Sequence, residues 1–244
     1  MTIKNKFIIG LAYIASLTAY GQNGLTISLP VIYSNVVEIK DNWTPPTAIN
    51  YKEYLSGKSL GYGINLNYSF RSTLIIKDKR FLLNVGVGYF QQRFDINRPF
   101  DYNSLVQIIY YTDYYVYHCL NLSAGLTYNL PIGEKYLLTG NLFYNQQNSF
   151  RQDYTPTYSR PNRGFEGFTQ TNTNQIDFGK MLNLSFGINS NIGNKFSVGL
   201  NVLIPIYTRW RNDKIFKDDP LTFSSPKFSI GSSISLTYYF KTKP

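Results

Sequence analysis

The chain has 244 residues, a length that suits one domain, and its composition is unusual for a soluble protein. Aromatic residues make up 17% of the chain and charged residues only 16%, against about 25% charged residues in a typical soluble domain. The mean hydropathy of −0.23 excludes a bundle of apolar membrane helices, and the single cysteine, Cys119, excludes an intrachain disulfide. This combination is typical of a chain in which lipid-facing and lumen-facing residues alternate.

The first 21 residues have the pattern of a signal peptide. A basic start with Lys4 and Lys6 precedes an apolar run over 7–17, and Ala19-Tyr20-Gly21 resembles a small-residue cleavage site. The apolar run is shorter than the roughly 20 residues that cross a bilayer, which disfavours an uncleaved anchor. We therefore predict a cleaved signal peptide over 1–21 and an exported domain over 22–244. That domain has 22 basic and 14 acidic residues, but its export argues against a nucleic-acid partner.

Eight segments alternate apolar and polar residues, which is the pattern of a strand with two different faces. From Leu60 to Phe70, for example, apolar residues occupy the even positions, and Gly, Asn or Ser occupy the odd ones. We expect each strand to cross a bilayer at a tilt, which takes about 9–11 residues. Pro30 cannot donate to a ladder, so a bulge or irregular pairing is expected there. The eight segments cover residues 25–34, 60–70, 83–89, 120–130, 138–145, 182–189, 196–206 and 228–240.

The connections between these segments alternate in length. Short turns are predicted at 71–80, 131–135 and 193–195, and long polar segments at 36–58, 94–113, 151–175 and 209–226. Short periplasmic turns and long extracellular loops are typical of outer-membrane barrels, and an even number of strands returns both termini to the periplasm. We therefore predict an all-β fold, an eight-stranded antiparallel up-and-down transmembrane β-barrel.

The two faces of the strands distinguish a membrane barrel from a soluble one. The polar face consists of Gly, Ser, Asn and Thr almost without Lys or Glu, whereas soluble surfaces are about 25–35% charged. Small neutral residues suit a narrow lumen, and tyrosines near the strand ends suit interfacial girdles. The alternative is a soluble β-sandwich or a lipocalin-like barrel with its apolar face inward.

The last strand carries a family resemblance. Residues 233–240 read Ser-Ile-Ser-Leu-Thr-Tyr-Tyr-Phe, in which Leu236, Tyr238 and Phe240 alternate toward a terminal aromatic. This ending, the richness in Tyr and Asn, and the signal ending in Gly-Gln resemble small outer-membrane barrels of the Bacteroidota, with an OmpA/OmpX-like architecture. The resemblance implies an outer-membrane location and makes Leu236, Tyr238 and Phe240 the signal read by the barrel-assembly machinery.

The chain shows no catalytic or metal-binding motif, so we expect neither enzymatic activity nor a cofactor. Lipid-modifying enzymes on eight-stranded barrels use a histidine with a nearby serine, but His118 is the only histidine and no serine lies two residues away. His118 has the parity of the outward residues, and Cys119 points to the opposite face. One His and one Cys make no zinc site. Calcium at Asp213, Asp218 and Asp219 is disfavoured because Lys and Arg alternate with them.

Two regions are candidates for contacts with partners. Most of the net charge gathers on the predicted periplasmic edge, where it either anchors the barrel to headgroups or forms a dock for an acidic partner. This basic rim consists of Arg71, Lys77, Lys79, Arg80, Lys135, Lys195, Lys241 and Lys243. The predicted extracellular loops are aromatic, and Tyr and Trp offer large contact areas at low entropic cost. Their candidate contact residues are Trp43, Tyr110, Tyr111, Tyr114, Tyr154 and Tyr158.

The lumen of an eight-stranded barrel is only wide enough for its own side chains, so we expect a hydrogen-bonded plug, with a thin water path as the alternative. We interpret the chain as a non-enzymatic outer-membrane barrel, a structural or accessory subunit of a larger cell-envelope assembly. Its expected partners are outer-membrane lipids, the barrel-assembly machinery and envelope proteins. The alternatives are a stand-alone narrow channel for small solutes and, third, a lipid-modifying enzyme.

Overall fold

The computed structural model describes residues 23–36, 39–41, 56–71, 78, 80–100, 109–160, 163–166, 169–210, 221–223 and 226–240. Eight strands form a barrel: β1 (Gly24–Val36), β3 (Ser56–Phe70), β4 (Phe81–Phe100), β5 (Ile109–Ile132), β6 (Tyr136–Arg160), β9 (Ile176–Ile192), β10 (Phe196–Trp210) and β12 (Pro226–Tyr239). Four short strands accompany them: β2 (Ile39–Asp41), β7 (Arg163–Glu166), β8 (Gln170–Asn172) and β11 (Leu221–Phe223). No helix within these ranges has the length and apolar character needed to cross a membrane. The predicted signal peptide, 1–21, lies outside the described residues.

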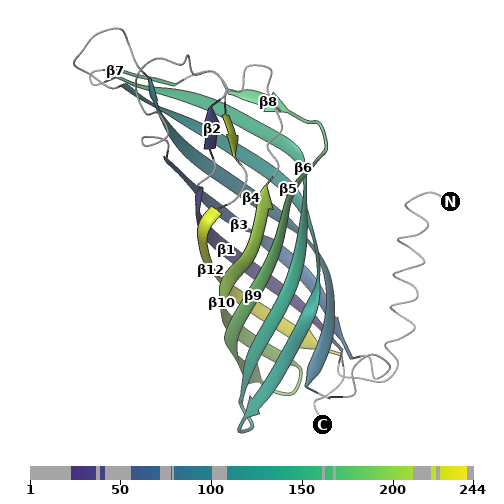
Figure 1. Ribbon diagram of the computed structural model, residues 1–244. Helices are drawn as coiled ribbons and strands as arrows, with labels where there is room; N and C mark the ends of the chain where they lie inside the picture. The colour runs from purple at the N-terminus through teal and green to yellow at the C-terminus, as the bar shows by residue number, and fades with distance from the viewer. Residues whose placement is uncertain are drawn as a thin grey trace, which may run out of the picture.

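The barrel is antiparallel and closed. Around the ring the strands follow the order β1, β3, β4, β5, β6, β9, β10 and β12, and β12 pairs with β1 to complete it (Figure 1). Barrel strands that follow one another in the chain are neighbours in space, so the predicted eight-stranded up-and-down topology is confirmed. The short strands β7 and β8 both pair with β6, and β2 pairs with β11.

Strict alternation puts apolar side chains outside the barrel and small polar ones inside. On β12, Ile234 is 58% exposed, whereas Ser233 and Ser235 on either side are 8% and 9% exposed. On β3, Ile64 and Leu66 face outward and Asn65 and Asn67 line the lumen. A soluble barrel would have the reverse arrangement. The predicted orientation of the two faces is therefore confirmed.

The expected irregularity at Pro30 is present. β1 pairs with β3 from Gly24 to Ser28 and again from Val31 onward, so Leu29 and Pro30 lie outside that ladder. The register is the same on both sides of the gap, and the ladder with β12 is continuous, so the strand contains no bulge there. The gap lies at the residue that has no N–H to donate.

Tight turns close one end of the barrel, which we call the lower end. Residues 133–135 join β5 to β6 and residues 193–195 join β9 to β10, within the predicted turns. Gly133 and Gly193 have φ of 64° and 63°, a conformation that glycine adopts without steric cost. The first and last described residues, Asn23 and Phe240, meet at this same end, where the Phe240 amide donates to the Asn23 carbonyl.

The upper end differs from the sequence-based expectation. We expected long loops over 94–113 and 151–175, but β4 continues to Phe100, β5 begins at Ile109 and β6 continues to Arg160. β5 and β6 have 24 and 25 residues, against 13 in β1, and their upper parts rise past the other strands with β7 and β8 at the edge (Figure 1). We call these upper parts of β4, β5 and β6, with β7 and β8, the extension sheet. Over 94–97 the loop assignment was wrong because Phe94 and Ile96 go on alternating with polar residues, despite a loop-like composition. Residues 151–160 are polar almost throughout, so the strand there had no alternation to indicate it.

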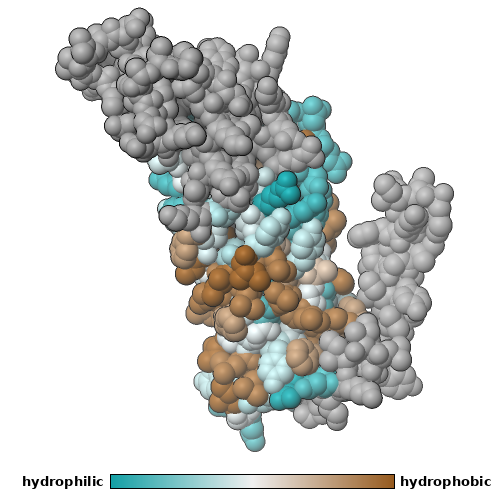
Figure 2. Space-filling view, viewed as in Figure 1, coloured by the Kyte–Doolittle hydropathy of each residue, from teal (hydrophilic) through white to brown (hydrophobic). Residues whose placement is uncertain are grey.

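The outward residues form an apolar belt around the barrel. Figure 2 shows one face of it. On β3 it runs from Leu60 to Tyr68, and nine residues at about 3.3 Å each with a tilt of about 40° span about 20–25 Å. That height matches the apolar band of membrane barrels, about 25 Å. The belt includes Ile27, Leu29, Ile64, Leu66, Val87, Leu120, Leu138, Leu142, Phe186, Ile188, Leu200, Val202, Ile204, Ile234 and Leu236.

Aromatic side chains border the belt at both ends. At the lower end, Phe81 and Tyr128 lie 4.9 Å apart between ring centroids, and the rings of Phe196 and Tyr238 lie 5.2 Å apart. At the upper end, the hydroxyls of three tyrosines donate to amide oxygens two residues further along, away from the belt, at 3.0 to 3.2 Å. These pairs are Tyr33 with Asn35, Tyr89 with Gln91 and Tyr144 with Gln146. The hydroxyls thus mark the boundary between the belt and the polar surface above it.

Candidate functional site

Uncharged polar side chains line the lower half of the lumen. One chain of hydrogen bonds crosses five neighbouring strands, with donor–acceptor distances of 2.5, 3.0, 2.6 and 2.8 Å. In order, Ser69 donates to Asn84, Asn84 to Thr127, Thr127 to Asn141 and Asn141 to Ser185. Because every bond points the same way around the barrel, each bond polarises the next. The network ties the strands together from inside.

Glycines leave room for the amide side chains of this lining. Gly86 lies opposite Asn67 on the neighbouring strand, and a Cβ at Gly86 would stand 2.0 Å from the Asn67 Oδ1. Gly199 lies opposite Asn189 in the same way, at 1.8 Å. In both pairs the missing side chain of the glycine leaves the space that the opposite amide occupies.

A cavity of about 150 Å³ occupies this lower half. Its upper end is apolar, formed by Ile32, Phe90 and Met181, and it reaches down to Leu82 and Tyr239 near the lower end of the barrel. None of its lining residues carries a charge. The amide and hydroxyl residues of its wall include Asn65, Asn67, Asn121, Ser123, Asn141, Asn145, Gln147, Asn183, Ser185, Asn189 and Asn201.

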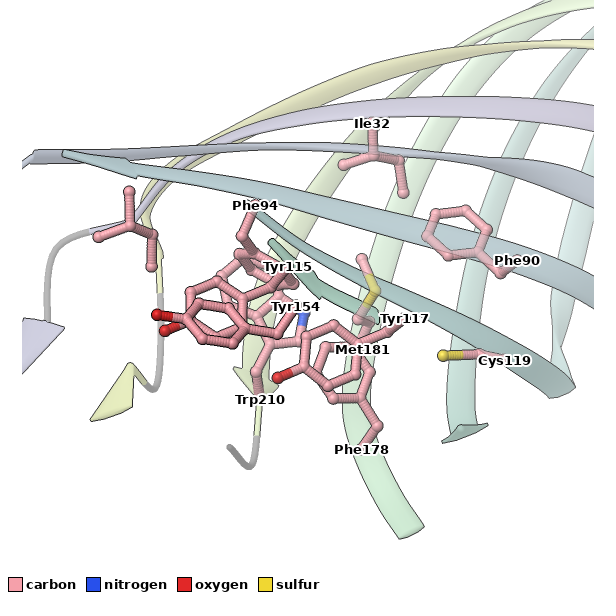
Figure 3. Packing of buried hydrophobic residues seen from close by; sticks show 11 residues of the cluster. Ile32, Phe90, Phe94, Tyr115, Tyr117, Cys119, Tyr154, Phe178, Met181 and Trp210 are labelled. Atoms are coloured by element: carbon pink, nitrogen blue, oxygen red, sulfur yellow. The ribbon is translucent and has the colours of Figure 1, made fainter. Parts of the chain in front are cut away.

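Aromatic residues fill the lumen above the cavity (Figure 3). The Phe94 ring packs edge-on against Trp210 at 4.8 Å between centroids, and Tyr117 stacks on Phe178 at 4.1 Å. These contacts have the close packing of a protein interior. This aromatic plug consists of Ile32, Phe90, Phe94, Ile96, Tyr115, Tyr117, Cys119, Tyr154, Phe178, Met181 and Trp210. The plug expected from the sequence was a polar, hydrogen-bonded one, so its aromatic character is a correction.

Three β-bulges aim aromatic residues into the plug. In the pairing of β10 with β9, Ile206 has no partner, and the alternation reverses so that Trp210 points inward. Phe150 has no partner in the pairing of β6 with β5, and Tyr154 turns inward as a result. Phe178 has no partner in the pairing of β9 with β6, and it is itself buried in the plug. Re-aiming a side chain is a common role of bulges.

His118 lies outside the barrel at the upper edge of the belt. Its Nδ1 is 2.6 Å from the Tyr89 hydroxyl, and its Nε2 is 3.3 Å from Asp153 Oδ2. Arg151 donates to the same carboxylate at 3.0 Å. The outward position expected for His118 is confirmed, as is the inward position of Cys119, which is fully buried. The contact with Asp153 could not be expected from alternation, because the bulge at Phe150 reverses the parity of β6.

The described members of the basic rim share the lower end of the barrel. Arg71 follows β3, Arg80 precedes β4, and Lys135 and Lys195 end the two tight turns. The carbonyls of Arg80, Lys135 and Lys195 each accept a backbone hydrogen bond from the neighbouring hairpin, at 2.8 to 2.9 Å. Lys77, Lys79, Lys241 and Lys243 lie outside the described residues. Binding of a partner to this rim stays a prediction.

The candidate loop contacts lie in strands wherever they are described. Tyr154 is buried and stacks on Tyr115 at 4.8 Å between centroids, so its side chain belongs to the plug. Tyr114 lies on the outer face of β5 under the Arg93 guanidinium, 4.9 Å from its ring centroid. Tyr110, Tyr111 and Tyr158 belong to β5 and β6, and Trp43 lies outside the described residues. The expectation that Tyr154 projects from a loop is therefore wrong.

The residues of the predicted assembly signal lie at the end of the last strand. Leu236 and Phe240 face outward, and Tyr238 packs edge-on against Phe240 at 5.5 Å between ring centroids.

Within the part of the chain that the structure describes, no group of three His, Cys, Asp or Glu residues forms a metal site. Asp213, Asp218 and Asp219 lie outside that part.

Comparison with known proteins gives only distant similarities. No protein-family model and no curated protein matches the chain. Among solved structures, the N-terminal β-barrel domain of OprF from Pseudomonas aeruginosa is 11% identical with a TM-score of 0.34, over 91% of this chain and 100% of that one. OprG from Pseudomonas aeruginosa is 7% identical with a TM-score of 0.39, over 91% and 97%. Ail, the attachment invasion locus protein of Yersinia pestis, is 13% identical with a TM-score of 0.30, over 90% and 99%. These values indicate no function, and the barrel fold follows from the strand pairing. The resemblance to Bacteroidota barrels stays a prediction.

Proposed function

We propose that the protein spans the outer membrane as a sealed barrel and serves as a structural or accessory subunit of a larger cell-envelope assembly. The observation that carries the membrane placement is the apolar belt, which is about as tall as a bilayer core and has aromatic borders at both ends. Such a surface would be an aggregation hazard in water, because monomeric soluble proteins rarely expose apolar patches larger than a few hundred Å².

Fractionation of cells that make the protein tests the membrane placement. We expect the processed chain to sediment with outer membranes, to resist alkaline carbonate, and to need detergent for release. Its folded form should also migrate differently from the boiled form in a detergent gel, because closed barrels keep their strands paired until heated. Recovery of the chain in the soluble periplasmic fraction would contradict the proposal.

The accessory role is supported by what the two ends of the barrel present. Above the belt, the outer face of the extension sheet carries paired charges, among them Arg93 with Asp95 at 2.7 Å and Arg151 with Asp153 at 3.0 Å. Below the belt lies the basic rim. A barrel that carries charged side chains at both ends is suited to contact other proteins.

Purification under mild detergent followed by mass spectrometry tests the assembly. We expect at least one envelope protein to co-purify in a constant ratio. Reversing the charges of Lys77, Lys79 and Arg80 should weaken that association if the rim is the dock, whereas reversing Arg93 and Arg151 should weaken it if the extension sheet is. A monomer without partners, or an association that neither set changes, would count against an accessory role.

A narrow channel is the alternative, and the aromatic plug argues against it. A single-channel recording in a planar bilayer distinguishes the two, because a sealed barrel passes no steady current.

The hypothesis of a lipid-modifying enzyme has one specific observation in its favour, the Asp153–His118–Tyr89 arrangement at the membrane edge. Lipid A from cells with the unaltered protein and with His118→Ala should have the same mass profile if the protein is not an enzyme.

A further inference from the structure

We propose that the luminal cavity binds a neutral polyhydroxyl ring of about monosaccharide size, a role that goes beyond the proposed assembly function. Four amide oxygens that line the cavity have no hydrogen-bond partner among the described residues: Asn121 Oδ1, Gln147 Oε1, Asn183 Oδ1 and Asn189 Oδ1. Asn121, Gln147 and Asn183 are 2%, 1% and 9% exposed. Native proteins pair nearly all buried polar atoms, so these orphans around one cavity call for a partner that enters it.

Asn121, Gln147 and Asn183 lie on three neighbouring strands, β5, β6 and β9. Asn121 and Gln147 are directly opposite each other in the pairing of β5 with β6. Asn145, two residues from Gln147 on the same face, is opposite Met181, and Asn183 is the next inward residue of β9 after Met181. Phe90, Met181 and Ile32 form the apolar surface above them. The site therefore has acceptors on its wall and an apolar ceiling.

The chemistry of this lining selects a neutral guest that carries hydroxyl groups. A charged guest would lose its water without gaining a counter-charge, since no Lys, Arg, Asp or Glu lines the cavity. A hydroxyl donates to an amide oxygen and also accepts from an amide nitrogen, so it satisfies these side chains in either orientation of the amide. An apolar guest would leave these amide oxygens without partners.

The size of the cavity limits the guest to a single ring. An engineered apolar cavity of about 150 Å³ is known to hold one benzene molecule. This cavity has the same volume but mostly polar walls, so it suits a six-membered polyol. Its hydroxyls would meet the amides, and its C–H face would lie against Phe90 and Met181.

Saturation-transfer NMR on the processed chain in detergent micelles tests the site, with D-glucose and myo-inositol as probes. Asn183→Leu is the informative variant, because the Asn183 side chain makes no hydrogen bond to the described residues and Leu has nearly the same shape. We expect both sugars to receive saturation, and Asn183→Leu to weaken binding about fivefold, the factor for one lost hydrogen bond. Asn148→Leu makes the same exchange outside the barrel on β6 and should leave binding unchanged. Heat-dependent gel mobility checks that each variant is folded.

Three outcomes would overturn the proposal. One is the absence of transfer to either sugar at millimolar concentration, which would mean that the cavity holds water only. Another is equal binding by the folded Asn183→Leu variant and the unaltered protein. The last is stronger binding of benzene, gluconate or ammonium than of glucose, which would assign the cavity to an apolar or charged guest. None of these results depends on whether the barrel belongs to an assembly.

Discussion

Gly61 on β3 lies directly opposite Gln92 on β4, and a Cβ at Gly61 would stand 2.4 Å from the Gln92 Oε1 and 2.5 Å from the Phe90 ring. Phe90 is packed into the aromatic plug, so it has little freedom to move aside. We expect Gly61→Val to destabilise the barrel by about 1–3 kcal/mol through overpacking, measured as the urea midpoint in micelles. Gly140→Val is the control, because a Cβ at Gly140 meets only the Phe186 ring at 4.0 Å, and it should leave the midpoint unchanged or raised. Equal losses in the two variants would contradict the plug packing.

Thr127 occupies the middle of the hydrogen-bond chain that crosses five strands in the lower lumen. It accepts from Asn84 at 3.0 Å and donates to Asn141 at 2.6 Å. Thr127→Val keeps the shape but leaves the buried amide of Asn84 and the half-buried amide of Asn141 each short of a partner, so we expect a loss of about 1–3 kcal/mol in the free energy of unfolding. Thr139→Val removes a single longer bond, to Asn201 at 3.3 Å, and should cost less. A larger loss for Thr139→Val than for Thr127→Val would show that the chain is not cooperative.

The lower half of this barrel could be predicted from the sequence because its strands alternate without interruption. Gly63, Asn65 and Asn67 point inward while Ile64 and Leu66 point outward, and a period of two residues is enough to assign both faces. The two turns were predicted because a short segment with a glycine separates two alternating runs in each case. In the structure both glycines, Gly133 and Gly193, have positive φ. Pro30 was correctly expected to disturb a ladder, since the missing N–H is a local property.

The aromatic character of the plug was missed for two different reasons. Phe94 and Tyr117 keep the parity of their strands. Continuing the alternation upward from Tyr89 on β4 and from Leu120 on β5 would have placed both inside the barrel, but a loop-like composition ended the predicted strands too early. Trp210 and Tyr154 could not be placed by alternation, because a single extra residue reverses the parity. Bulges at Ile206 and Phe150 depend on how the neighbouring strand pairs, which is a long-range property. The contact of His118 with Asp153 was out of reach for the same reason.

Asp78 at the lower end forms an exposed ion pair with Arg80, at 2.7 Å. The side-chain hydrogen bond from Arg80, helped by a backbone one, lowers the pKa of Asp78 from 3.8 to about 2. Because the folded pKa is the lower one, the stabilisation is present above about pH 4 and is lost as the pH falls toward about 2. The carboxyl ¹³C shift of Asp78 should follow this titration, and Arg80→Gln should return the pKa toward 3.8. A pKa near 3.8 in the unaltered protein would mean that the pair does not form in solution.

Leu200 lies at the middle of the apolar belt, and its depth makes it the sharpest probe of the membrane placement. It is 60% exposed and is flanked in the ladders by Ile188 and Ile234, which also face outward. In a bilayer, we expect Leu200→Arg to cost about 2–4 kcal/mol in the free energy of unfolding, because the charge would lie near the midplane. Phe196→Arg, at the lower aromatic border of the same strand, should cost only about 0–1 kcal/mol, because headgroups and water reach that level. Refolding into lipid vesicles, followed by denaturant titration, measures both. In a water-soluble barrel both arginines would be solvated and neither variant would lose much stability, so equal and small losses would refute a bilayer around the belt.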